Sequence, residues 1–161
     1  MIVLSCGGYG MMLAVAHRRE VAAMKQLINI LNSMICELEY RALPLPELCR
    51  FGAAQGSGTV SAFMHVLADA LDKQISPDVG VCTIVALKET KNLPKFAAAQ
   101  LQMLGQTLGR FDLSGQLTSM EHCRQACLGQ LEVLEYQQPQ RLRNYQTLGF
   151  CAGAALAILL I

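Results

Sequence analysis

Apolar residues recur at alternating steps of three and four along most of this chain, which is the spacing of one face of an α-helix. The clearest stripe lies between residues 21 and 42, and two prolines follow it at positions 44 and 46. Because a residue that precedes proline disfavours helical geometry, we expect a long amphipathic helix that ends before Pro44. The stripe consists of Val21, Met24, Ile28, Leu31, Ile35, Leu38 and Ala42.

Shorter stripes follow the two prolines and are separated by turn residues. Residues 47–55 are expected to form a short helix, and Thr59 is the expected N-cap of the next one. Ser76 should cap a further helix, with Pro77 at its first helical position. Each of these segments has the helical period, so the middle of the chain is predicted to be helical throughout.

The last third of the chain contains the same pattern. Gly109 and Asp112 mark a boundary, where Gly109 should end one helix and Asp112 should cap the next. That helix is expected to reach Pro139, and a last helix should carry the rest of the chain. There is no alternating strand pattern of useful length. The sequence therefore predicts an all-α fold, an antiparallel bundle of about six helices.

Both ends of the chain are apolar and free of charged side chains. Residues 1–16 and 148–161 each meet the polar middle at a basic cluster. Membrane orientation follows the side on which Lys and Arg lie, so we predict short N- and C-terminal transmembrane helices with the domain 17–147 between them in the cytoplasm. At 14–16 residues each, both segments are shorter than the about 20 residues of a typical span. The boundary residues are Arg18, Arg19, Arg141 and Arg143.

Composition excludes several classes of function. The formal net charge is +1 and tryptophan is absent, so neither a basic footprint nor a stacking platform for nucleic acid is expected. The seven cysteines are irregularly spaced, as in proteins of a reducing compartment. Cys123 and Cys127 lie one helical turn apart and could give two thiolates to zinc, but a closed site needs four ligands. No constellation of nucleophile, base and acid is present, so we expect no enzyme, no cofactor and no metal.

Three ordered stretches carry a resemblance to a known family. They are Glu37-Leu38-x-Tyr40 followed by Pro44-Leu45-Pro46-Glu47, then Leu104-Gly105-x-x-Leu108-Gly109-x-x-Asp112-x-x-x-Gln116, then Tyr145-x-x-Leu148-Gly149-x-x-x-Gly153 before the apolar tail. Their order and spacing resemble stage III sporulation protein AB of endospore-forming bacteria. The candidate interaction residues on these motifs are Glu37, Tyr40, Pro44, Leu45, Gly105, Gly109, Asp112 and Gln116.

The resemblance implies a fold and a cellular role. The family resembles the cytoplasmic F domain of the type II secretion inner-membrane platform protein. It implies a domain in the mother-cell cytoplasm, attached to the outer forespore membrane, in a trans-envelope complex needed for endospore formation. By analogy such a domain would dock a secretion-type ATPase, contact other membrane components of the complex and self-associate. A membrane-bound helical scaffold or regulator without an ATPase partner, and a soluble helical protein that binds thiols or metal, remain open.

Several motif residues also have local structural explanations. Pro44 would fix the turn after the long helix, while Gly109 and Asp112 would end and cap helices. Glu37, Tyr40 and Gln116 are polar groups on amphipathic helices, which either bond to one another across the bundle or face a partner. The sequence leaves these two alternatives open.

Overall fold

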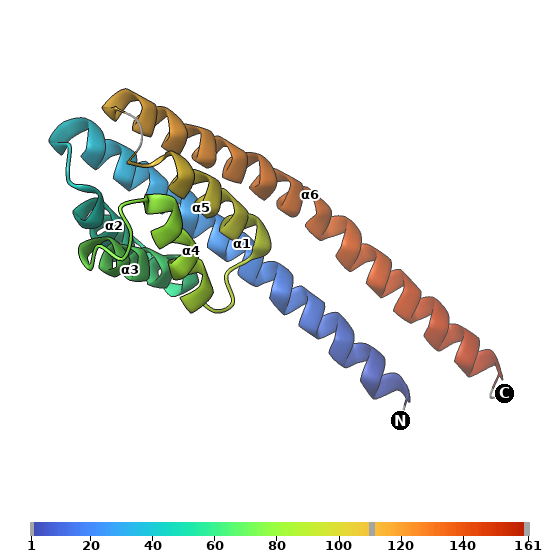
Figure 1. Cartoon of the computed structure of the whole chain (residues 1–161). Coiled ribbons are helices and arrows are strands. Elements are labelled where there is room, and N and C mark those ends of the chain that lie inside the picture. The colour runs from blue at the N-terminus through green and yellow to red at the C-terminus, as the bar shows by residue number, and fades with distance from the viewer. Residues whose placement is uncertain (1, 110–111, 160–161) are drawn as a thin grey trace.

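The protein is all-α in a computed structural model, which describes the backbone of residues 2–109 and 112–159 and the side chains of residues 15–109 and 112–136. Six helices follow one another in these ranges, with no strand among them (Figure 1). The all-α prediction is therefore confirmed. The helices are α1 (Ile2–Arg41), α2 (Leu45–Gln55), α3 (Gly58–Asp72), α4 (Val79–Glu89), α5 (Lys95–Thr107) and α6 (Leu113–Leu159).

The helices alternate in direction, so every second connection lies at the same end of the bundle (Figure 1). The long helices α1 and α6 pack against each other in antiparallel orientation and extend beyond the other four. We call these extensions, residues 2–20 and 137–159, the stalk. Both chain termini lie at the tip of the stalk. The α1–α2, α3–α4 and α5–α6 connections lie at the opposite end, which we call the far end.

The core is formed by the apolar stripes that the sequence shows. In α1, Met24, Leu27 and Leu31 are fully buried, and Phe63 of α3 is the largest fully buried side chain. Helix α3 contacts α1, α2 and α4, so Phe63 lies where three helices pack around a fourth. The predicted stripe of α1 is thus buried as expected, because its period places it on one face of the helix.

Some helix boundaries differ from the prediction. Ala42 adopts a positive φ of 47° and lies outside α1, so it is exposed rather than part of the stripe. The N-cap of α3 is Ser57, not Thr59, and the N-cap of α4 is Asp78, whose carboxylate accepts the Gly80 N–H at 2.9 Å. The Asp78 carboxylate thus satisfies a backbone N–H of the first turn of α4. The helix starts after Asp78, and Pro77 lies outside it.

The predicted break at Pro139 is wrong, because α6 runs without interruption from Leu113 to Leu159. A proline inside a helix removes one backbone hydrogen bond. That loss is confined to one turn, and the backbone of α6 stays helical on both sides of it.

In the part of the chain that the structure describes, no helix has a stretch long and apolar enough to cross a bilayer. The prediction of transmembrane helices at residues 1–16 and 148–161 is therefore not supported. The side chains of residues 1–14 and 148–161, Arg141 and Arg143 lie outside the described residues.

Candidate functional site

The far end of the bundle collects the motif residues from two distant parts of the sequence. Glu37 and Tyr40 lie in the last turns of α1, and Gln116 lies in the first turn of α6. The direction of the helices places both at the end opposite the termini (Figure 1). The two motifs therefore belong to one end of the bundle, although 76 positions separate Tyr40 from Gln116 along the chain.

The α1–α2 connection is a tight turn whose shape explains its prolines. Pro44 precedes α2 with φ −56°, and its carbonyl accepts the Leu48 N–H at 2.9 Å. Leu45 is partly buried against the core. These two motif residues set the direction of α2, which agrees with the turn-making role expected for Pro44.

Tyr40 is the most exposed large hydrophobic residue described at this end, with 87% of its surface accessible. Glu37 is half-buried and forms an ion pair with Arg41, with Arg41 Nε 3.6 Å from Glu37 Oε2. A tyrosine that projects into solvent contributes little to the core. Tyr40 therefore favours the alternative in which the motif faces a partner.

Glycines in the second motif are required by close packing. At Gly105, a Cβ would lie 2.1 Å from Thr83 Oγ1, so only glycine lets α5 approach α4 this closely. Gly109 adopts φ +78°, a conformation that residues with side chains rarely take, and a Cβ there would lie 2.9 Å from Val79 Cγ2. The prediction that Gly109 ends a helix is confirmed, since α5 ends at Thr107.

Asp112 caps α6, as predicted. Its carboxylate accepts the Gly115 N–H at 3.1 Å and the Ser114 hydroxyl at 2.9 Å. Both hydrogen bonds favour the charged form, and the Ser114 bond is the larger cause, so the pKa of Asp112 lies below its ordinary value of 3.8. The negative charge also lies at the N-terminus of a long helix, where it is favourable.

Two substitutions at Asp112 should distinguish the contribution of its hydrogen bonds to stability from that of its charge. The folded state lowers the pKa of Asp112, so its contribution to stability is present above the ordinary pKa of 3.8 and is lost as the pH falls through the lower folded value. Asp112→Ala should lower the melting temperature at neutral pH. Asp112→Asn keeps an acceptor, so it should melt near wild type at neutral pH and lose less stability in acid.

Circular dichroism melting curves from neutral to acidic pH measure both effects. Glu121 titrates in the same range, because its hydrogen bond from Arg124 lowers its pKa to about 2. The melting temperature of each variant is therefore compared with that of wild type at the same pH. If the melting temperature of Asp112→Asn fell with pH as much as that of wild type, the Asp112 charge would not contribute to stability, which would contradict the prediction.

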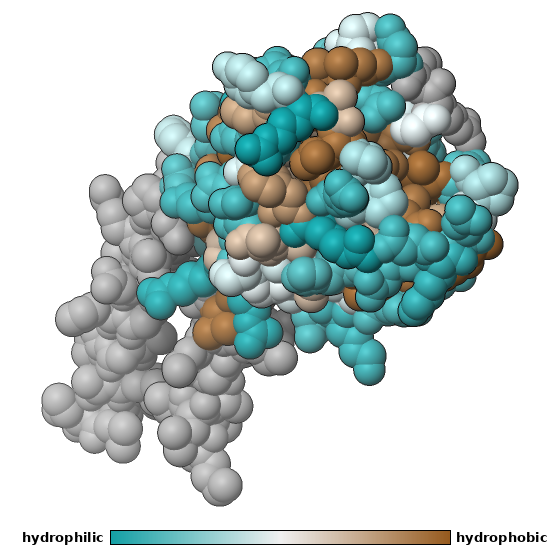
Figure 2. Space-filling model, turned by 90° about the vertical axis from the view of Figure 1, so that its left-hand side faces the viewer, coloured by the Kyte–Doolittle hydropathy of each residue, from teal (hydrophilic) through white to brown (hydrophobic). Residues whose placement is uncertain are grey.

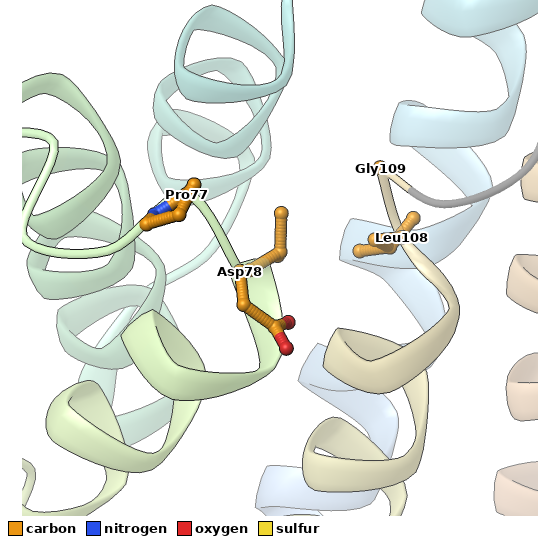
Figure 3. A pocket seen from close by; sticks show the side chains of 5 residues that line it. Pro77, Asp78, Leu108 and Gly109 are labelled. Atoms are coloured by element: carbon orange, nitrogen blue, oxygen red, sulfur yellow. The ribbon is translucent and has the colours of Figure 1, made fainter.

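A small cavity of about 260 Å³ opens between the α3–α4 connection and the end of α5. Figure 3 shows Pro77 and Asp78 on one wall and Leu108 and Gly109 on the facing one. Its volume suits an apolar side chain of a partner protein rather than a large cofactor. Gly109 was expected from the sequence, but this pairing was not, because Pro77 and Leu108 lie in two separate connections that only the fold brings together.

Two exposed apolar residues at the far end were also missed. Ile75, in the α3–α4 connection, is 53% exposed, and Leu113, the first residue of α6, is 44% exposed. With Tyr40 in the last turn of α1, one exposed large apolar side chain thus lies in or next to each of the three connections. Figure 2, viewed from the left-hand side of Figure 1, shows apolar brown surface between polar teal surface at this end. Leu113 directly follows the motif residue Asp112, and this position next to a motif could have identified it from the sequence.

The cysteine pair lies within the bundle and not at its surface. Cys123 and Cys127 are buried, and burial raises the pKa of Cys49, a third buried thiol, to about 12. A hydrogen bond with Cys127 is the main cause that raises the pKa of Cys123. Among the described residues there is no group of three or more His, Cys, Asp or Glu that could hold a metal ion.

Together, the six helices define an all-α bundle with a two-helix stalk and with exposed apolar side chains at the far end. The chain belongs to the stage III sporulation protein AB family, whose profile matches residues 1–161. It is also similar to a solved structure titled "Stage III sporulation protein AB (SpoIIIAB)", with 25% sequence identity and a TM-score of 0.66 over 76% of this chain and 98% of that one. No curated protein matches it in sequence. The family resemblance is confirmed, and it assigns the protein to stage III of sporulation.

Proposed function

We propose that this protein is a membrane-attached platform of the sporulation complex and that its far end docks a cytoplasmic secretion-type ATPase. The observation that carries the proposal is the position of the motifs. Residues of the first and second motifs lie at the end of the bundle opposite both termini, where Tyr40, Ile75 and Leu113 are exposed.

Attachment at the stalk is supported by the direction of α1 and α6. Within the two charge-free ends of the chain, residues 2–16 and 148–159 belong to helices that run side by side to the same tip (Figure 1). Two short apolar helices that enter a bilayer together bury more apolar surface than either does alone. The membrane would be the outer forespore membrane, which leaves the far end in the mother-cell cytoplasm.

Docking at the far end is supported by its chemistry. Exposed tyrosine and aliphatic side chains on rigid helix ends resemble the centres of protein interfaces, where few residues supply most of the binding energy. The cavity beside Leu108 offers a place for one partner side chain. The ATPase is the partner that the family resemblance indicates, and other membrane components would bind along the stalk.

Binding of the ATPase to the full chain in lipid nanodiscs tests the proposal. Tyr40→Ala should weaken binding about tenfold or more, as expected for an aromatic residue at the centre of an interface. Adding Ile75→Ala and Leu113→Ala should abolish it. Tyr136→Ala is the matched control, because Tyr136 is 74% exposed on the other long helix, towards the stalk. Surface plasmon resonance gives the dissociation constants.

Two results would overturn the proposal. If the wild-type chain does not bind the ATPase, the ATPase is not its partner. If Tyr40→Ala and Tyr136→Ala weaken binding equally, the far end is not the docking surface. Helical content measured by circular dichroism confirms that each variant is folded, since all four side chains are exposed.

A further inference from the structure

The ion pair between the two long helices shows which residues of α1 and α6 lie at the same level. Lys25 Nζ lies 2.8 Å from Glu135 Oε1, so these two residues are at the same level of α1 and α6. The helices are antiparallel and rise by the same amount per residue. Moving towards the N-terminus on α1 therefore matches moving towards the C-terminus on α6.

This register brings two basic clusters to one level of the stalk. Arg19 and Arg18 lie six and seven residues before Lys25, and Arg141 and Arg143 lie six and eight residues after Glu135. The four arginines, which we call the arginine collar, thus occupy matching positions where the stalk leaves the bundle. The sequence alone gives two separate clusters about 120 residues apart.

The charged residues beyond the ion pair are mostly basic. From Lys25 and Glu135 to the two termini, Glu20 is the only acidic residue in the sequence, and it is half-buried. Arg18 and Arg19 are both exposed. Past the collar, the chain has no charged side chain at either end. Four basic residues at one level, next to segments without charged side chains, are complementary to an anionic bilayer surface, with phosphates outside and hydrocarbon within.

We propose that the arginine collar binds the phosphate groups of anionic phospholipids and so holds the bundle upright on the membrane. Arginine suits this role because its planar guanidinium donates two parallel hydrogen bonds to a phosphate. The long side chains also reach the headgroup level while the helices below them enter the apolar layer. This inference rests on the proposed membrane attachment and adds its dependence on lipid charge.

Vesicle flotation of the full chain, synthesised in the presence of liposomes, tests the collar. One set of liposomes contains phosphatidylcholine alone, and the other contains phosphatidylcholine with phosphatidylglycerol. Wild type should float preferentially with the anionic set, and added salt should weaken this preference. Arg18→Gln with Arg19→Gln should reduce binding to anionic liposomes about tenfold or more, and the fourfold variant should remove the preference.

The matched control removes the same charge at the far end, through Arg41→Gln and Lys73→Gln, both at exposed positions. It should bind anionic liposomes like wild type. Equal flotation of wild type with both sets would overturn the collar and leave membrane attachment standing. Flotation with neither set would overturn membrane attachment itself. Equal losses in the collar and control variants would show an effect of net charge only, which also overturns the proposal.

Discussion

Phe63→Ala should lower the free energy of unfolding by about 3–5 kcal/mol, the cost of removing a large aromatic side chain from a packed core. Phe63 is completely buried on α3, which packs against α1, α2 and α4, so the cavity is bordered by several rigid helices. Neighbouring helices that hold their positions cannot fill the space left by the Phe63 ring. The loss of stability should therefore include the free-energy cost of an open cavity.

Chemical denaturation followed by circular dichroism measures this loss. His65→Ala is the control, because His65 is exposed on the same helix two residues further on. It should change stability by less than about 0.5 kcal/mol, as surface substitutions usually do. A loss below about 1 kcal/mol for Phe63→Ala would contradict the packing of α3 against its neighbours.

Gly105→Ala should lower stability by about 1–3 kcal/mol, although alanine normally favours a helix. A Cβ at Gly105 would lie 2.1 Å from Thr83 Oγ1 and 2.7 Å from Thr83 Cβ, so α4 and α5 would have to move apart. Thr83 has no easy escape, because it is buried, its side chain is branched at Cβ, and its hydroxyl donates to the Val79 carbonyl at 2.9 Å.

A second substitution shows whether Thr83 causes the loss. Thr83→Ala removes the closest atom, so the double variant should be more stable than the two single losses predict, with a coupling of about 1 kcal/mol. Gly129→Ala is the control, since a Cβ there meets nothing within 4 Å. It should stabilise α6 by about 0.5–1 kcal/mol. Losses of equal size at Gly105 and Gly129 would refute the close approach of α4 and α5.

Features that depend on one local signal agree with the structure, while some helix boundaries at which a second signal was present do not. The stripe of α1, the stop before Pro44 and the cap at Asp112 were predicted because each depends on neighbouring residues in the chain. Pro139 misled the prediction, because a proline removes hydrogen bonding from one turn only, and the backbone of α6 stays helical on both sides of it. Thr59 misled it as well, because Ser57 starts α3 two residues earlier.

The candidate site was predictable in part. Tyr40, Gly109 and Asp112 were found from their motifs. Ile75 has no motif, and its exposure depends on how the α3–α4 connection lies against the bundle. The cavity beside Leu108 could not be found at all, since its walls come from two connections that are distant in sequence.

The sequence by itself determined the helical segments, the charge-free ends and the basic residues beside them, because periodicity and charge are properties of short stretches of chain. The tertiary structure alone decided which connections share an end and which arginines share a level. Those relations depend on helix direction and on contacts such as the ion pair between Lys25 and Glu135, which join residues far apart in the chain. Packing between helices, and not the local pattern, therefore places both proposed surfaces.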